Sequence, residues 1–469
     1  MVFSSTIFLF AFLPATLLGY YLIRKELRNF LLLVMSLLFY TAGEPKFVFI
    51  MMASIVANYV LGIFLGWATE HNLLRRQILI LALIVNLGIL FYYKYYDFTI
   101  NNINLLFGCT LPLRNIVLPI GISFFTFQGM SYVLDVYMGK GEVQKNPLYV
   151  ALYIALFPQL IAGPIVRYSD VNREIVSRQE TLDDFASGVQ RFTVGLAKKV
   201  ILSNQFALLA DQSFETAPEQ LGACLAWLGA IAYTLQIYFD FSGYSDMAIG
   251  LGRMFGFHFR ENFDYPYTAA SVAVFWRKWH ISLSSWFRDY VYIPLGGNRT
   301  GNVYLHLLIV FLLTGLWHGA SWNFVVWGLW HGFFLIVERI LRKHETEIPL
   351  PKFLKWLYTM LVVLIGWVFF RAEGLITGLT YLKCMLGIMG AESYAMSLPF
   401  YIKEYGLLIL VAGVCSTPII PFLNRCCDES PILCRARNIV LPVVVAFLLL
   451  TSIGALSVTS YNPFIYFNF

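Results

Sequence analysis

Residues 312–332 read LLTGLWHGASWNFVVWGLWHG and place two histidines, His318 and His331, inside an apolar block. One helix over 304–341 would be about 57 Å long, whereas the hydrocarbon core of a bilayer is about 30 Å thick. The block must therefore break, and HGAS at 318–321 supplies a glycine and a serine for that break. We predict helices over 304–318 and 322–341, with His318 at a helix end beside a wet cavity in the outer half of the membrane.

The whole chain shares this apolar character. Of its 469 residues, 59% are hydrophobic and 13% are charged, whereas soluble domains carry about 25% charged residues. This composition predicts an all-α polytopic membrane protein with roughly 10–12 transmembrane helices plus re-entrant segments. The expected spans are 6–23, 29–43, 47–67, 78–95, 148–166, 190–210, 221–247, 304–318, 322–341, 354–370, 403–423 and 438–458.

Loop charge predicts the orientation of the spans. Loops rich in Lys and Arg face the cytoplasm, and the basic loops here place both termini outside. The first apolar run precedes its basic cluster, so we expect a retained span and not a signal peptide. The net charge of +6 then reflects cytoplasmic loops and not a nucleic-acid partner. We expect one membrane domain over 1–469, with a cytoplasmic amphipathic segment at 167–190.

Two apolar stretches are too irregular for simple spans. They read LPIGISFFTFQGMSYVLDVY (118–137) and VFWRKWHISLSSWFRDYVYIPLGG (274–297). Both are candidates for re-entrant segments, because irregular or charged backbone at membrane depth must be buried in protein or line a wet cavity.

Histidines within membrane segments are expensive and need partners, which favours a functional role for His318. An imidazole with a pKa near 6.5 can accept and return a proton, as acylation of a hydroxyl requires. The alternative is a structural histidine bonded to a backbone carbonyl, which we favour for His331. The two histidines, 13 residues apart, do not converge on a continuous helix, so we expect no metal site. The seven cysteines are expected to be free thiols.

Further charged residues lie among apolar ones. Asp240 and Asp246 in QIYFDFSGYSDMAIG either orient a cavity, pair with arginines or cap a helix. Arg277 and Lys278 either bind an anionic acyl donor or belong to an interfacial helix whose cations reach the headgroups. We include all four, together with Trp317 and Asn323 beside His318, among the candidate substrate- or donor-binding residues.

Taken together, these strings resemble the membrane-bound O-acyltransferase (MBOAT) family, in its bacterial alginate O-acetyltransferase-like branch. In order, the motifs are GISFFTFQGMSYVLDVY, FPQLIAGPIVRY, QIYFDFSGYSDMAIGLGRMFGF, NFDYPY, FWRKWHISLSSWFRDYVYIPLGGNR, GLWHGASWNFVVWGLWHG and SYNPFIYFNF. The resemblance implies that His318 is the catalytic histidine and that His280 is a second family histidine. It also implies a ring of helices around a central funnel and tunnel.

The resemblance also implies the reaction. An acyl group, most often acetyl, would pass from a cytoplasmic thioester such as acetyl-CoA to a hydroxyl of an exported polysaccharide, often through a secreted or periplasmic partner. No bound cofactor is implied, and the location would be the bacterial cytoplasmic membrane. The motifs leave the polymer open among alginate, cellulose, peptidoglycan and other polysaccharides. The alternative from the residues alone is a transporter or flippase in which the histidines relay protons.

Overall fold

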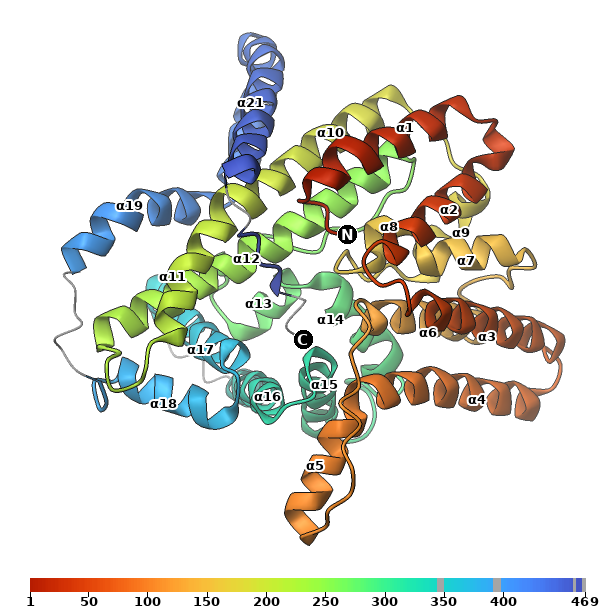
Figure 1. The fold of residues 1–469 in the computed structure, drawn as a ribbon, viewed down its shortest axis with the longest axis horizontal. Coiled ribbons are helices and arrows are strands. Elements are labelled where there is room, and N and C mark those ends of the chain that lie inside the picture. Colours follow the sequence, from red (N-terminus) through yellow and green to blue (C-terminus); the bar gives the residue numbers. More distant parts are fainter. Residues whose placement is uncertain (344–349, 391–397, 459–460, 466–469) are drawn as a thin grey trace. The chain divides into compact units, whose positions relative to one another are not determined.

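The computed structural model describes residues 1–343, 350–390, 398–458 and 461–465, and every regular element in these ranges is helical (Figure 1). Within these ranges, six helices are long and apolar enough to cross a membrane, and a seventh span is counted if a pair bent by 56° crosses as one. The all-helical membrane fold is therefore confirmed. Two expected spans form shorter apolar helices, Phe8–Leu22 and Val303–His318, and a further short apolar helix, Leu375–Met385, lies outside the expected spans. Parts of the basic loop 342–352 and of the tail 460–469 lie outside the described residues.

The chain divides into two compact units. The first comprises Met1–Phe192 and Tyr244–Arg260. Its helices are α1 (Leu13–Leu22), α2 (Arg28–Thr41), α3 (Val48–Trp67), α4 (Asn72–Leu90), α5 (Tyr96–Phe107), α6 (Ile122–Tyr137), α7 (Pro147–Ala155), α8 (Phe157–Leu160) and α9 (Tyr168–Val176), with most of α10 (Leu182–Ala197) and the end of α12 (Ala223–Met254). Helix α9 and the first part of α10 cover the segment 167–190 that is expected to be amphipathic.

A buried polar contact fixes the centre of the first unit. Helix α6 is buried from Ile122 to Val136 and packs on α3 and α4. There Asn58 of α3 and Asn86 of α4 exchange two amide hydrogen bonds of 3.0 and 2.8 Å. Gly129 makes room for this pair, because a Cβ there would lie 2.5 Å from Nδ2 of Asn58. The stretch expected to be re-entrant thus contains one uninterrupted helix, which Pro119 and Gly121 precede and which accommodates Gly129.

The second unit comprises Thr193–Gly243 and Glu261–Phe469. Besides the first part of α12, it contains α11 (Asn204–Glu215), α13 (Val272–Lys278), α14 (Ile281–Phe287), α15 (Val303–His318), α16 (Trp322–Lys343), α17 (Lys352–Arg371), α18 (Leu375–Met385), α19 (Leu398–Cys415), α20 (Ile419–Asp428) and α21 (Pro431–Val458). The RKWH stretch is broken as expected, because α13 and α14 meet at His280, whose φ is 44°.

Helices α15 and α16 form a hairpin that confirms the predicted break. Helix α15 ends at His318, Gly319 is extended, and α16 starts at Trp322. Glycines bring the two backbones into contact: a Cβ at Gly315 would lie 2.3 Å from the Phe324 carbonyl oxygen, and a Cβ at Gly328 would lie 2.3 Å from that of Phe311. Small residues at crossing points allow such close packing in membranes. The glycines therefore fix where His318 emerges from the hairpin.

Candidate active site

His318 lies at the C-terminal end of α15, with 7% of its surface exposed. Three aromatic rings meet the imidazole edge-on, with centroid distances of 4.9 Å for Trp317, 5.0 Å for Trp327 and 5.0 Å for Phe370. These rings come from α15, α16 and α17. They restrict the orientation of the imidazole, which is what a positioned proton acceptor requires.

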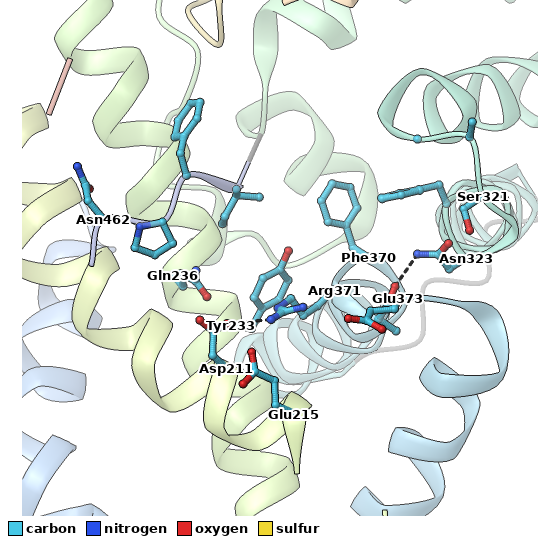
Figure 2. Close-up of a pocket in the computed structure, with 17 residues that line it drawn as sticks. Asp211, Glu215, Tyr233, Gln236, Ser321, Asn323, Phe370, Arg371, Glu373 and Asn462 are labelled. Atoms are coloured by element: carbon cyan, nitrogen blue, oxygen red, sulfur yellow. Dashed lines mark hydrogen bonds and ion pairs between the residues drawn. The ribbon is translucent and has the colours of Figure 1, made fainter. Parts of the chain in front are cut away.

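His318 lines a small cavity of about 10 Å³, which is room for about one water molecule. A much larger cavity of about 790 Å³ lies beside it in the same unit (Figure 2). Phe370 and Ile465 line both cavities. These two side chains therefore form the wall through which a reacting group would reach His318.

His280 lies near the same wall. Its ring is 6.0 Å from that of Trp317 and 4.5 Å from that of Phe241, which also lines the small cavity. Oδ1 of Asn262 accepts from the Ser282 backbone N–H at 3.1 Å and lies 3.2 Å from Nδ1 of His280. Because this oxygen is an acceptor, the neutral imidazole carries its proton on Nδ1. Nε2 then has a free lone pair and no hydrogen-bond partner among the described residues.

A buried ion pair holds the C-terminal tail at the site. Lys199, in the π-helical turn after α10, lies 2.6 Å from Oδ1 of Asp240, and the two side chains are 3% and 2% exposed. Lys199 also donates to the Pro463 carbonyl, and the Ile465 N–H donates to Oδ2 of Asp240 at 3.0 Å. The pair is thus satisfied by the tail backbone, and it places Ile465 in the wall beside His318.

The other candidate residues have diverse surroundings. Lys278 pairs with Asp264 at 3.5 Å, while Arg277 on the same helix is exposed. In the first unit, Asp246 pairs with Arg191 at 2.7 Å. Trp317 lies between the rings of His280 and His318, whereas Asn323 lines the large cavity. The structure therefore places three of the expected residues in the lining of these two cavities, His318 and Asp240 in the small one and Asn323 in the large one. Trp317 and His280 lie next to them through ring contacts.

His331 lies fully buried in the middle of α16. Trp276 and Trp327 meet its ring edge-on at 5.1 and 5.3 Å. Neither ring nitrogen has a hydrogen-bond partner among the described residues. On α17, Gly366 faces it so closely that a Cβ there would lie 2.6 Å from Nε2. The backbone-carbonyl bond expected for His331 is therefore not found among the described residues, and aromatic packing surrounds the ring in its place.

The sequence analysis did not identify several residues of the site. Phe370 and Ile465 form the wall, and Tyr233 lines the large cavity, yet each is one apolar or aromatic residue among many in the sequence. Lys199 did offer a signal, as a cation beside an apolar run within an expected span. Its partner Asp240 is 41 residues away, and only the fold reveals the pairing.

Comparison with known proteins identifies the class. Residues 89–379 match the membrane-bound O-acyltransferase family. The probable alginate O-acetylase of Pseudomonas aeruginosa is 47% identical over 80% of this chain and 73% of its own length. That of Pseudomonas putida is 40% identical over the full length of both chains. The peptidoglycan O-acetyltransferase of Helicobacter pylori is 35% identical over all of this chain and 98% of its own.

These relatives support the interpretation as an enzyme over the interpretation as a transporter. The family acts on an acyl donor, and the relatives are bacterial. With its helices suited to crossing a membrane several times, the chain belongs to the membrane-bound O-acyltransferase family.

Proposed function

We propose that this protein transfers an acetyl group from a thioester, such as acetyl-CoA, to a hydroxyl destined for an exported polysaccharide. The transfer is either direct or through a secreted partner. Relatives named as alginate O-acetylases and as a peptidoglycan O-acetyltransferase support this class of acceptor. We place the protein in the bacterial cytoplasmic membrane, with both termini outside and with the amphipathic segment 167–190 in the cytoplasm.

The observation that carries the proposal is the position of His318. Its imidazole lies at a helix end, oriented by three rings, and two of the side chains that line its cavity also line a cavity of about 790 Å³. A cavity of this volume accommodates a small-molecule substrate. Phe370 and Ile465 thus lie between the cavity of the proton acceptor and the space for a substrate.

In the proposed reaction, His318 acts as general base. The acceptor oxygen attacks the thioester carbonyl carbon and forms a C–O bond, while the hydroxyl proton passes to the imidazole. The C–S bond then breaks, and the imidazolium returns the proton to the departing thiolate. His280, whose Nε2 has a free lone pair near the same wall, is the second candidate for proton transfer. Arg277 and Lys278 are the candidates for binding an anionic donor.

The test uses the purified protein in liposomes with acetyl-CoA, and it measures thioester consumption and acetylation. His318→Asn should lower the rate by about 10²–10⁴, the range of general acid–base catalysis. The matched control is His306→Asn, because His306 lies on the same helix and its Nδ1 donates to the Gly297 carbonyl at 3.1 Å. An asparagine amide can replace that bond. Equal rates for wild type and His318→Asn would refute the role of His318.

A further inference from the structure

The large cavity beside His318 has a polarity that specifies what enters it. Its charged lining residues, among those described, are Asp211, Glu215, Arg371 and Glu373. No lysine or histidine lies among the described lining residues. Arg371 is already paired, because its guanidinium lies 2.8 Å from Oδ1 of Asp211, whose Oδ2 accepts from Tyr461. Three carboxylates against one guanidinium leave the cavity with two formal negative charges.

The two remaining carboxylates, Glu215 and Glu373, are exposed, whereas the deeper lining is buried and neutral. Figure 2 shows Glu215 beside Asp211 on α11, and Glu373 beside Asn323 on the opposite wall. A ligand that enters from the exposed part of the lining therefore meets acidic groups before it reaches the buried part. These carboxylates repel an anionic ligand. Arg371, the one cation of the described lining, does not offset this repulsion because it is paired with Asp211.

The buried part offers hydrogen-bonding atoms that have no partner. Tyr233 Oη, Gln236 Oε1 and Asn323 Oδ1 all belong to residues no more than 4% exposed, and none has a hydrogen-bond partner among the described residues. Buried polar atoms in native proteins are normally paired with protein, water or ligand. Three such atoms in one cavity therefore indicate a polar ligand or ordered water.

The orientation of Asn323 makes this lining selective for donors. Its Nδ2 donates to the carbonyls of Phe369 and Ala372 at 3.1 and 2.8 Å. These two bonds fix the amide, so Oδ1 can only accept. The carboxylates, Gln236 Oε1 and Asn323 Oδ1 accept, while the Tyr233 hydroxyl can donate or accept, so the lining complements a group that carries several hydroxyls.

Resting on the proposed function, we infer that this cavity binds the acceptor as a neutral, hydroxyl-rich sugar and excludes sugars that carry a carboxylate. A protonated amine would also suit acceptor atoms, but it has no lone pair with which to attack a thioester. A hydroxyl both donates to Asn323 Oδ1 and serves as the nucleophile once it loses its proton. The acceptor at this site is therefore not a uronate residue, even though alginate, for which several relatives are named, is a polymer of uronates.

The experiment compares a neutral cello-oligosaccharide with an oligouronate of the same length as acetyl acceptors, in detergent at low salt with acetyl-CoA. We expect kcat/KM to be at least about tenfold higher for the neutral sugar, a ratio that corresponds to about 1.4 kcal/mol. The double variant Glu215→Gln/Glu373→Gln should raise kcat/KM for the uronate and so narrow the preference for the neutral sugar. The control is Glu219→Gln, an acidic residue near α11 that does not line the cavity.

A second variant tests the buried acceptor atoms. Asn323→Leu should raise KM for the neutral sugar several-fold more than it lowers kcat, because it removes a binding atom and not the base. Equal use of both sugars by the wild type, or an unchanged preference in the double Gln variant, would overturn the inference. If thioester consumption depends on His318 but neither sugar is acetylated, this inference fails and the proposed function stands. If the thioester is not consumed at all, the proposed function itself fails.

Discussion

The hairpin of α15 and α16 contains two copies of the same tripeptide, Trp-His-Gly, in two different environments. His318 ends α15 and lines a cavity, whereas His331 lies in the middle of α16 among aromatic rings. Trp327 touches both imidazoles, edge-on, at 5.0 and 5.3 Å. The motif is therefore not what separates a candidate base from a packing residue.

What separates them is the backbone around each histidine. The chain leaves the helix at Gly319, so His318 faces the loop, the tail and the cavities that they enclose. His331 has a full helical turn on either side, and Gly366 of α17 lies against it. Reactivity follows from access, and access follows from the position of the helix end. The following substitutions test this comparison.

The largest effect on stability is expected from the ion pair that holds the tail beside His318. Lys199→Met leaves Asp240 as a buried, unpaired carboxylate, which destabilises a protein by about 3–5 kcal/mol. The measurement is chemical unfolding of the protein in detergent, together with the acetylation rate. Lys199→Met/Asp240→Leu should recover most of the stability, because a buried ion pair replaced by apolar residues is often neutral.

The matched control for this pair is Arg191→Met, which breaks the contact with Asp246. Arg191 is 30% exposed, so water can solvate the remaining charge and the loss should be smaller. Comparable losses for Arg191→Met and Lys199→Met would contradict the assignment of Lys199 and Asp240 as the buried anchor of the tail.

A smaller effect is expected where α17 packs against the hairpin at His331. Gly366→Ala places a methyl group 2.6 Å from Nε2 of His331, and such overpacking costs about 1–3 kcal/mol. The control is Gly88→Ala on α4, because a Cβ there meets nothing within 4 Å and alanine favours a helix. Adding His331→Ala to Gly366→Ala should relieve the strain, so the two changes should not be additive in unfolding measurements. Additive losses would show that Gly366 does not act through His331.

The difference between the two histidines is tested directly by replacing each of them with phenylalanine. His331→Phe replaces an imidazole that lacks described partners with an apolar ring of similar size, so stability should change by less than about 1.5 kcal/mol. Acetylation should stay within a few-fold of wild type, whereas His318→Phe should abolish it. Loss of activity in His331→Phe, with folding intact, would place both histidines in the reaction.

The break at His318 was predictable because it follows from length alone: 38 apolar residues cannot cross the bilayer as one straight helix. Glycine and serine at 319 and 321 then locate the break. Asp240 was less predictable. Its place in an apolar helix marks it as important, but its partners are Lys199, 41 positions away, and the backbone of Ile465, 225 positions away. A contact of that range is set by helix packing, and one sequence does not encode it in a local pattern. The acceptor orientation of Asn323 likewise depends on two carbonyls of the 369–372 segment.

The smallest effect concerns a histidine in water, which extends the comparison beyond the hairpin. His258 is half exposed and lies 2.9 Å from Glu174 and 3.3 Å from Asp184. Partial burial lowers its pKa, but hydrogen bonds and charge attraction from the two carboxylates outweigh this, so the pKa is raised above 6.5. A raised folded-state pKa gives stability that is fully present below pH 6.5 and is lost as the pH rises through the folded-state pKa. We therefore expect wild type to exceed His258→Gln in unfolding free energy by up to about 1 kcal/mol at pH 5.5. The difference should vanish at pH 8.5, and a difference independent of pH would show that His258 acts by packing and not by charge.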